Sequence, residues 1–134
     1  MDIAILGLGT VGSGLVKLIQ NHNEAQKTPK LNIKYIFVRD EKRAKEKAKE
    51  FNLDSSLFTW DLKKITEDDS VKIVAETMGG VDHTEKILLD LISHKKNIIT
   101  ANKDLIALRG ENLFEAAKKN LKESIDKRNK KFGD

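Results

Sequence analysis

The feature that most constrains the fold of this chain is the stretch "AILGLGTVGSGLVKLI" near its amino terminus. The apolar run at residues 2–6 predicts a buried strand, and after the glycines Val11, Leu15, Leu18 and Ile19 recur at helical spacing. A strand that turns through glycines into a helix is the usual opening of a βαβ unit. The rest of the sequence decides whether this turn holds a phosphate.

Further apolar runs alternate with helical patterns along the chain. Four more strands are expected: "NIKYIFV" at 32–38, "SLFTW" at 56–60, "VKIVAET" at 71–77 and "NIIT" at 97–100. Helices are expected at 41–51, briefly near 61–69, around Ile87, Leu88, Leu91 and Ile92, and through Leu113, Ala117, Leu121 and Ile125. This alternation predicts an α/β fold, a doubly wound, Rossmann-like parallel sheet in the order 3-2-1-4-5 with helices on both faces. No sixth strand is visible.

Length and composition narrow the class of protein. The 134 residues contain no linker, so we expect residues 1–134 to form one domain. The chain has no cysteine and only three histidines, so we expect no disulfide and no metal site, and a reducing cytoplasm suits it. Its apolar runs are too short to cross a bilayer, and no signal peptide is visible. These features predict a soluble, cytoplasmic protein.

The net charge of +4 raises the possibility of nucleic-acid binding. The lysines gather in "EKRAKEKAKE" and in the carboxyl-terminal run "KKNLKESIDKRNKKFGD". Acidic residues lie among them and aromatic residues are not interleaved, so a small basic nucleic-acid-binding protein is the weaker reading.

The glycine turn has the pattern G-x-G-x-x-G, formed by Gly7, Gly9 and Gly12. Gly7 allows the tight turn, Gly9 allows the backbone to approach a pyrophosphate, and Gly12 allows the helix to pack closely on the sheet. We also expect a Cβ at Gly9 to strain the turn. The alternative is a glycine turn that only packs well, but its place between a strand and a helix favours dinucleotide binding.

The second strand ends in "VRD", which bears on the choice of cofactor. An acidic residue here binds the ribose 2′-hydroxyl of NAD, whereas an arginine accommodates the 2′-phosphate of NADP. Arg39 followed by Asp40 favours NADP, with Asp40 as a helix cap and with Lys42 and Arg43 adding positive potential. NAD remains possible, and Arg39 could also be a solvated charge.

Two later stretches, "AETMGG" at 75–80 and "NIITANKDLIALRG" at 97–110, follow expected strands. Ligands bind at the carboxyl edge of such a sheet. We therefore expect Thr77, Gly79 and Gly80 to line the cofactor cleft, and Ala101, Asn102 and Lys103 to lie near its nicotinamide half. Taken singly, each stretch could be an ordinary turn followed by surface residues.

The motifs "GLGTVGSGLVKLI", "VRD", "ETMGG" and "ITANKDLIA", in this order, resemble the amino-terminal domain of homoserine dehydrogenase over residues 1 to about 120. That family interconverts L-homoserine and L-aspartate 4-semialdehyde with NAD(P), on the pathway to threonine, isoleucine and methionine. The resemblance thus implies an oxidoreductase of amino-acid biosynthesis.

The resemblance also implies roles for individual residues. The pyrophosphate would be contacted by Gly7, Gly9, Thr10 and Val11. Arg39 would contact the adenosine ribose or its phosphate. The ribose and nicotinamide would be contacted by Thr77, Gly79, Ala101 and Asn102. Lys103 corresponds to the family's lysine at the active-site cleft, which takes part in proton transfer or substrate polarisation.

The family continues into a sixth strand and a substrate-binding, dimer-forming domain, but this chain ends in "LKESIDKRNKKFGD". We therefore expect the cofactor half alone, as a truncated product, an isolated domain or half of a split enzyme, inactive without a complementary substrate domain. A non-catalytic NADP(H)-binding or regulatory module is the alternative. Self-association through the strand at 97–100 is also expected, since an unpaired edge can bind another chain.

Overall fold

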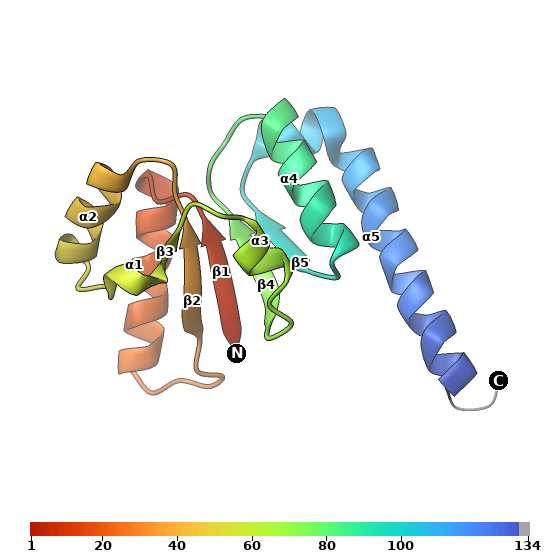
Figure 1. Ribbon diagram of the computed structural model, residues 1–134, viewed down its shortest axis with the longest axis horizontal. Coiled ribbons are helices and arrows are strands. Elements are labelled where there is room, and N and C mark those ends of the chain that lie inside the picture. The colour runs from red at the N-terminus through yellow and green to blue at the C-terminus, as the bar shows by residue number, and fades with distance from the viewer. Residues whose placement is uncertain (132–134) are drawn as a thin grey trace.

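The computed structural model describes the backbone of residues 1–131 and the side chains of residues 1–128. Its centre is a five-stranded parallel sheet in the order β3-β2-β1-β4-β5, which confirms the expected topology (Figure 1). The strands are β1 (Asp2–Leu6), β2 (Asn32–Phe37), β3 (Phe58–Thr59), β4 (Val71–Glu76) and β5 (Asn97–Thr100). Residues 132–134, the end of the basic carboxyl-terminal run, lie outside the described part.

Helices connect the strands as the alternating pattern predicts. They are α1 (Thr10–Glu24), α2 (Glu41–Glu50), α3 (Lys63–Thr66), α4 (Asp82–Ser93) and α5 (Lys103–Lys131), with a short 3₁₀ turn, η1 (Ser55–Leu57), before β3. None of the helices described is both long and apolar enough to cross a membrane.

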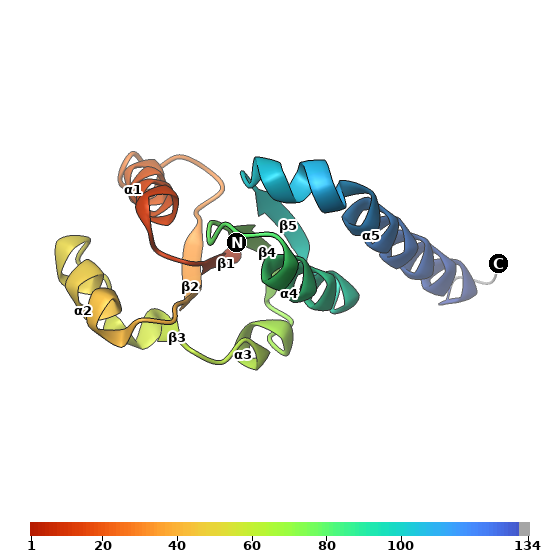
Figure 2. The same cartoon turned by 90° about the horizontal axis from the view of Figure 1, so that it is seen from above.

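The two faces of the sheet carry separate hydrophobic cores, because successive side chains of a strand point to opposite faces. In β1, Ile3 and Ile5 pack into a core shared with α1 and α2. Ala4 and Leu6 pack into a second core shared with α3, α4 and the first part of α5. Figure 2 shows α1 and α4 on opposite sides of the sheet. Helices on both faces are thus confirmed.

The packing of α1 differs from the face that its apolar residues indicate. Val11 is 56% exposed and Leu18 is 67% exposed, whereas Gly12 and Val16 are buried. The helix approaches the sheet through Gly12, and this contact turns Val11 outward. The helix is as expected, but these two of its apolar residues do not lie on its buried face.

Helix α5 packs on the fold only along its first part. Leu105 and Leu113 are buried, whereas Leu121 and Ile125 are exposed although they continue the same spacing. Figure 2 shows the rest of the helix running away from the sheet. The helix continues past Ile125 to Lys131, since lysine and arginine are good helix formers.

Strand β5 lies at one edge of the sheet. Within the described residues it pairs only with β4, and Ile99 on it is 61% exposed. The opposite backbone edge of β5 therefore has no neighbouring strand in this part of the chain.

Candidate functional site

The glycine turn lies at the carboxyl end of β1, in the middle of the sheet. Gly7 has a φ of +90°, a left-handed conformation that favours glycine, and its amide donates to the carbonyl of Phe37 at 2.8 Å. A Cβ on Gly12 would lie 2.7 Å from the carbonyl oxygen of Gly7 and 2.7 Å from Oγ1 of Thr77. Gly7 and Gly12 thus have the expected roles in the turn and in the packing of α1.

Gly9 is needed for a different reason. Its φ is −83°, so the expectation that a Cβ would strain the backbone here is wrong. That Cβ would meet no protein atom within 4 Å. Gly9 is also the N-cap of α1 and has no side chain to bond the first amides of the helix. The open space and the helix start suit a phosphate group, which a side chain at this position would displace.

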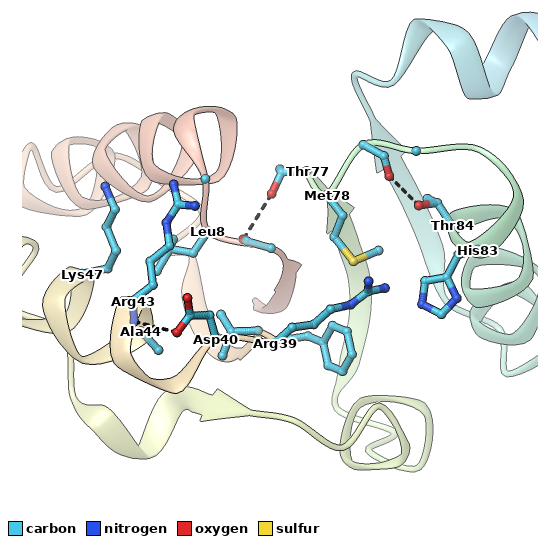
Figure 3. A pocket seen from close by; sticks show the side chains of 16 residues that line it. Leu8, Arg39, Asp40, Arg43, Ala44, Lys47, Thr77, Met78, His83 and Thr84 are labelled. Carbon is cyan, nitrogen blue, oxygen red and sulfur yellow. Dashed lines mark hydrogen bonds between the residues drawn. The ribbon is translucent and has the colours of Figure 1, made fainter.

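A cavity of about 400 Å³ opens beside this turn (Figure 3). Its walls come from the glycine turn, the end of β2, α2, the loop after β4 and the start of α4. The lining residues are Gly7, Leu8, Gly9, Phe37, Val38, Arg39, Asp40, Arg43, Ala44, Lys47, Thr77, Met78, Gly79, Gly80, His83 and Thr84.

Three cationic side chains line the cavity: Arg39, Arg43 and Lys47. Arg39 follows β2, and the other two lie one turn apart on α2. Of the two residues expected to add positive charge, Arg43 lines the cavity and Lys42 does not. This concentration of positive charge suits a phosphorylated ligand.

Asp40 serves as the cap of α2, as expected. One oxygen of its carboxylate accepts from the backbone amide of Arg43 at 3.2 Å, and the residue has extended backbone angles. Figure 3 shows this bond beside the cavity.

The loop after β4 forms the wall opposite α2. Thr77 lines the cavity, but its hydroxyl donates to the carbonyl of Leu6 at 2.8 Å and to that of Gly7 at 3.2 Å. Figure 3 shows the bond to Gly7. Thr77 therefore secures the glycine turn. Gly79 and Gly80 have φ values of +78° and +79°, which explains the paired glycines of "ETMGG".

The second half of the predicted site lies outside the lining of the cavity. Ala101 and Lys103 are exposed, and Lys103 is the first residue of α5. Asn102 caps this helix, since its Oδ1 accepts from the amide of Leu105 at 3.2 Å. Its Nδ2 donates to the carbonyl of Gly80 at 2.6 Å, which joins the start of α5 to the cavity wall.

The structure therefore brings Gly7, Gly9, Arg39, Thr77 and Gly79 together around one cavity. Helix α1 starts next to Gly9 with Thr10, Val11 and Gly12, which do not line the cavity. Sequence reasoning missed Lys47, which lines the cavity, and Glu76, which accepts from two amides of the loop after β4. Lys47 could have been found from its spacing of four residues after Arg43, and Glu76 from its place as a carboxylate ending an apolar strand.

The fit of these residues to a nicotinamide dinucleotide follows from the open space at Gly9. The turn offers free volume and a helix amino terminus to a pyrophosphate, and the cations lie farther along the same cavity. Gly7, Gly9 and Arg39 are thus the residues that would hold the diphosphate and the adenosine end.

Comparison with known proteins agrees with this geometry. The family described as the NAD-binding domain of homoserine dehydrogenase matches residues 7–124. Homoserine dehydrogenase from Bacillus subtilis is 40% identical over 121 residues, which make up 88% of this chain and 27% of that protein. The Synechocystis enzyme is 39% identical over 118 residues, 87% of this chain and 26% of that protein.

Solved structures give the same result. A homoserine dehydrogenase from S. aureus superposes with a TM-score of 0.74 at 41% identity, covering 90% of this chain and 31% of its own. One from Thiobacillus denitrificans gives a TM-score of 0.76 at 27% identity, covering 90% of this chain and 27% of its own. The chain thus spans less than a third of the length of these relatives. By its fold, its glycine turn and these matches, the chain belongs to the homoserine dehydrogenase family, where it corresponds to the NAD-binding domain.

Proposed function

We propose that this chain binds NADP(H) and forms the cofactor half of a homoserine dehydrogenase. The observation that carries the proposal is the single cavity that joins the open glycine turn to Arg39, Arg43 and Lys47. A 2′-phosphate would find three cations there, while the nearby carboxylate of Asp40 accepts from a helix amide. NADP is therefore preferred over NAD.

When bound, NADP supplies a hydride acceptor for the hydroxyl-bearing carbon of L-homoserine, which becomes L-aspartate 4-semialdehyde. In this proposal the pyrophosphate would be contacted by Gly9, Thr10 and Val11. The nicotinamide would lie toward Ala101 and Asn102. Lys103 would accept the proton of the substrate hydroxyl. The setting would be the cytoplasm and the biosynthesis of threonine, isoleucine and methionine, as in the enzymes that the chain resembles.

Calorimetric titration of the purified chain with NADPH and with NADH tests the proposal. We expect both to bind and NADPH to bind more tightly. Absence of binding by either would refute the cofactor role, and tighter binding of NADH would refute the preference for NADP.

Arg39→Ala should weaken the binding of NADPH and leave the affinity for NADH nearly unchanged. The loss of bonds to a charged group is worth about 1.5–3 kcal/mol, or roughly 10- to 150-fold in Kd. Lys42→Ala is the matched control, since it removes a positive charge from the start of α2 outside the cavity lining. If Arg39→Ala lowered the affinity for both cofactors equally, Arg39 would instead contact the adenine. If Lys42→Ala lowered the affinity for NADPH as much as Arg39→Ala, the effect would be that of general positive charge and not of a specific contact.

We further propose that the chain self-associates weakly through the edge of β5 that has no neighbouring strand among residues 1–131. Unpaired backbone groups there can hydrogen-bond to a second strand, and exposed Ile99 would be covered. Light scattering over a concentration series should show a dimer that Ile99→Lys abolishes. Leu108→Lys is the control, because Leu108 is 64% exposed but lies on α5. A monomer at all concentrations, with rapidly exchanging amides at 97–100, would contradict this pairing.

A further inference from the structure

Glu76 is a buried carboxylate for which the proposed function gives no role. It ends β4 and is only 1% exposed, so its charge must be stabilised by the protein around it. Its partners in the described part of the chain are three hydrogen-bond donors.

These donors come from two separate elements. Oε1 accepts from the backbone amides of Met78 at 2.7 Å and Gly79 at 2.9 Å. Oε2 accepts from the hydroxyl of Thr100 at 2.5 Å, at the end of β5. One side chain thus joins the loop that lines the cavity to the strand that leads to Lys103.

Further hydrogen bonds extend this connection on both sides. The hydroxyl of Thr84 donates to the carbonyl of Gly79 at 2.6 Å, as Figure 3 shows. The backbone amide of Asn102 donates to Oγ1 of Thr100 at 3.1 Å, and its side-chain Nδ2 donates to the carbonyl of Gly80 at 2.6 Å. A continuous network therefore runs from the cavity wall to the cap of α5, with Glu76 at its centre.

We propose that Glu76 is a positioning residue that holds the Gly79–Gly80 loop in its binding conformation and fixes Lys103 relative to the cofactor. The inference rests on the proposed function, because it gives the loop a dinucleotide to bind. Two successive glycines with positive φ have much conformational freedom to lose, and a carboxylate that accepts two amides of this loop keeps it ordered before the ligand arrives. The same carboxylate then transmits occupancy of the cavity to β5 and α5.

Glu76→Gln tests this role with little change in volume. The amide oxygen can still accept from Met78 and Gly79, but an NH₂ group then faces Thr100, whose hydroxyl loses the carboxylate oxygen to which it donates. We expect about tenfold weaker binding of NADPH and of NADH, the scale of one charge-assisted bond, with their affinity ratio unchanged. That unchanged ratio distinguishes this variant from Arg39→Ala.

Hydrogen exchange gives the readout that a merely structural role would not move. In the wild-type chain, NADPH should slow exchange both at 38–44, beside the cavity, and at 100–106, outside its lining. In Glu76→Gln the slowing at 38–44 should persist at saturating NADPH. The slowing at 100–106 should be much reduced, with the bond from Asn102 to Gly80 still joining the start of α5 to the loop. Thr100→Val removes the bond from β5 to Glu76, together with the bond that Oγ1 of Thr100 accepts from the backbone amide of Asn102. It should give the same reduction at 100–106, so the inference can be tested even if Glu76→Gln does not fold.

Glu85→Gln is the matched control. Glu85 lies on α4 and links it to α5 through Arg109 at 3.5 Å, but it does not line the cavity. It should leave both affinity and protection unchanged. Wild-type protection at 100–106 in the folded Glu76 variant, or an equal loss in Glu85→Gln, would overturn the inference. Failure of the wild-type chain to bind either cofactor would instead refute the proposed function.

Discussion

Gly9→Val should abolish binding of NADPH and NADH while the chain remains folded. The Cβ of the new side chain points into space where no protein atom lies within 4 Å, and the φ of −83° is accessible to valine. The folded state therefore accommodates the substitution, but the volume expected to hold the pyrophosphate is filled. We expect Kd to rise at least about a hundredfold, or roughly 2.8 kcal/mol. Calorimetry measures the binding, and circular dichroism verifies the fold.

Two neighbouring glycines make this test specific. Gly14→Val introduces the same side chain into the same helix, also with no protein atom within 4 Å of its Cβ, but outside the cavity lining. It should leave affinity nearly unchanged. Gly12→Ala should instead destabilise the fold by about 1–3 kcal/mol, since its Cβ would overlap Gly7 and Thr77. Normal affinity in Gly9→Val would remove this turn from the site.

The second large effect concerns turnover. Residues 1–134 should bind the cofactor but form no measurable NADPH from homoserine. Holding a substrate carbon in attack geometry against the nicotinamide can account for about five to eight orders of magnitude in rate. Lys103 is exposed and outside the cavity lining, so it cannot by itself fix the ammonium and carboxylate of a small zwitterion.

Absorbance of NADPH in the near ultraviolet measures this reaction directly. Activity should appear when the portion of the B. subtilis homoserine dehydrogenase beyond the matched region is supplied, and Lys103→Ala should remove it. Lys118→Ala is the control, since Lys118 is an exposed lysine elsewhere on α5. Robust turnover by residues 1–134 alone, lost on Lys103→Ala, would show that the short chain is a complete catalyst.

Much of the fold could be predicted from the sequence, because its signals are local. The alternation of apolar runs and helical patterns predicts the strand order, and the roles of Gly7 and Gly12 follow from a turn and a close contact within one βαβ unit. The exposure of Val11 could not be predicted in this way. It depends on how α1 is rotated on the sheet, which the contact at Gly12 determines.

The candidate site could be predicted where each residue acts near its own strand end. Arg39 and Gly79 are examples, and both line the cavity. The sequence marks Glu76 as a carboxylate at the end of an apolar strand, but not its partner, because Thr100 lies 24 residues away. The bond from Thr77 to the turn at Gly7 likewise joins residues 70 apart in the chain. Such contacts require the sheet to be assembled first.

The two cores share the strands β1, β2 and β4, and this has a thermodynamic consequence. Because alternate residues of β1 belong to different cores, neither layer can melt without exposing the other face of that strand. A ligand held at Gly7, directly after β1, therefore adds its binding free energy to the whole domain. Increasing amounts of cofactor should move one cooperative melting transition to higher temperature, with no second transition left behind.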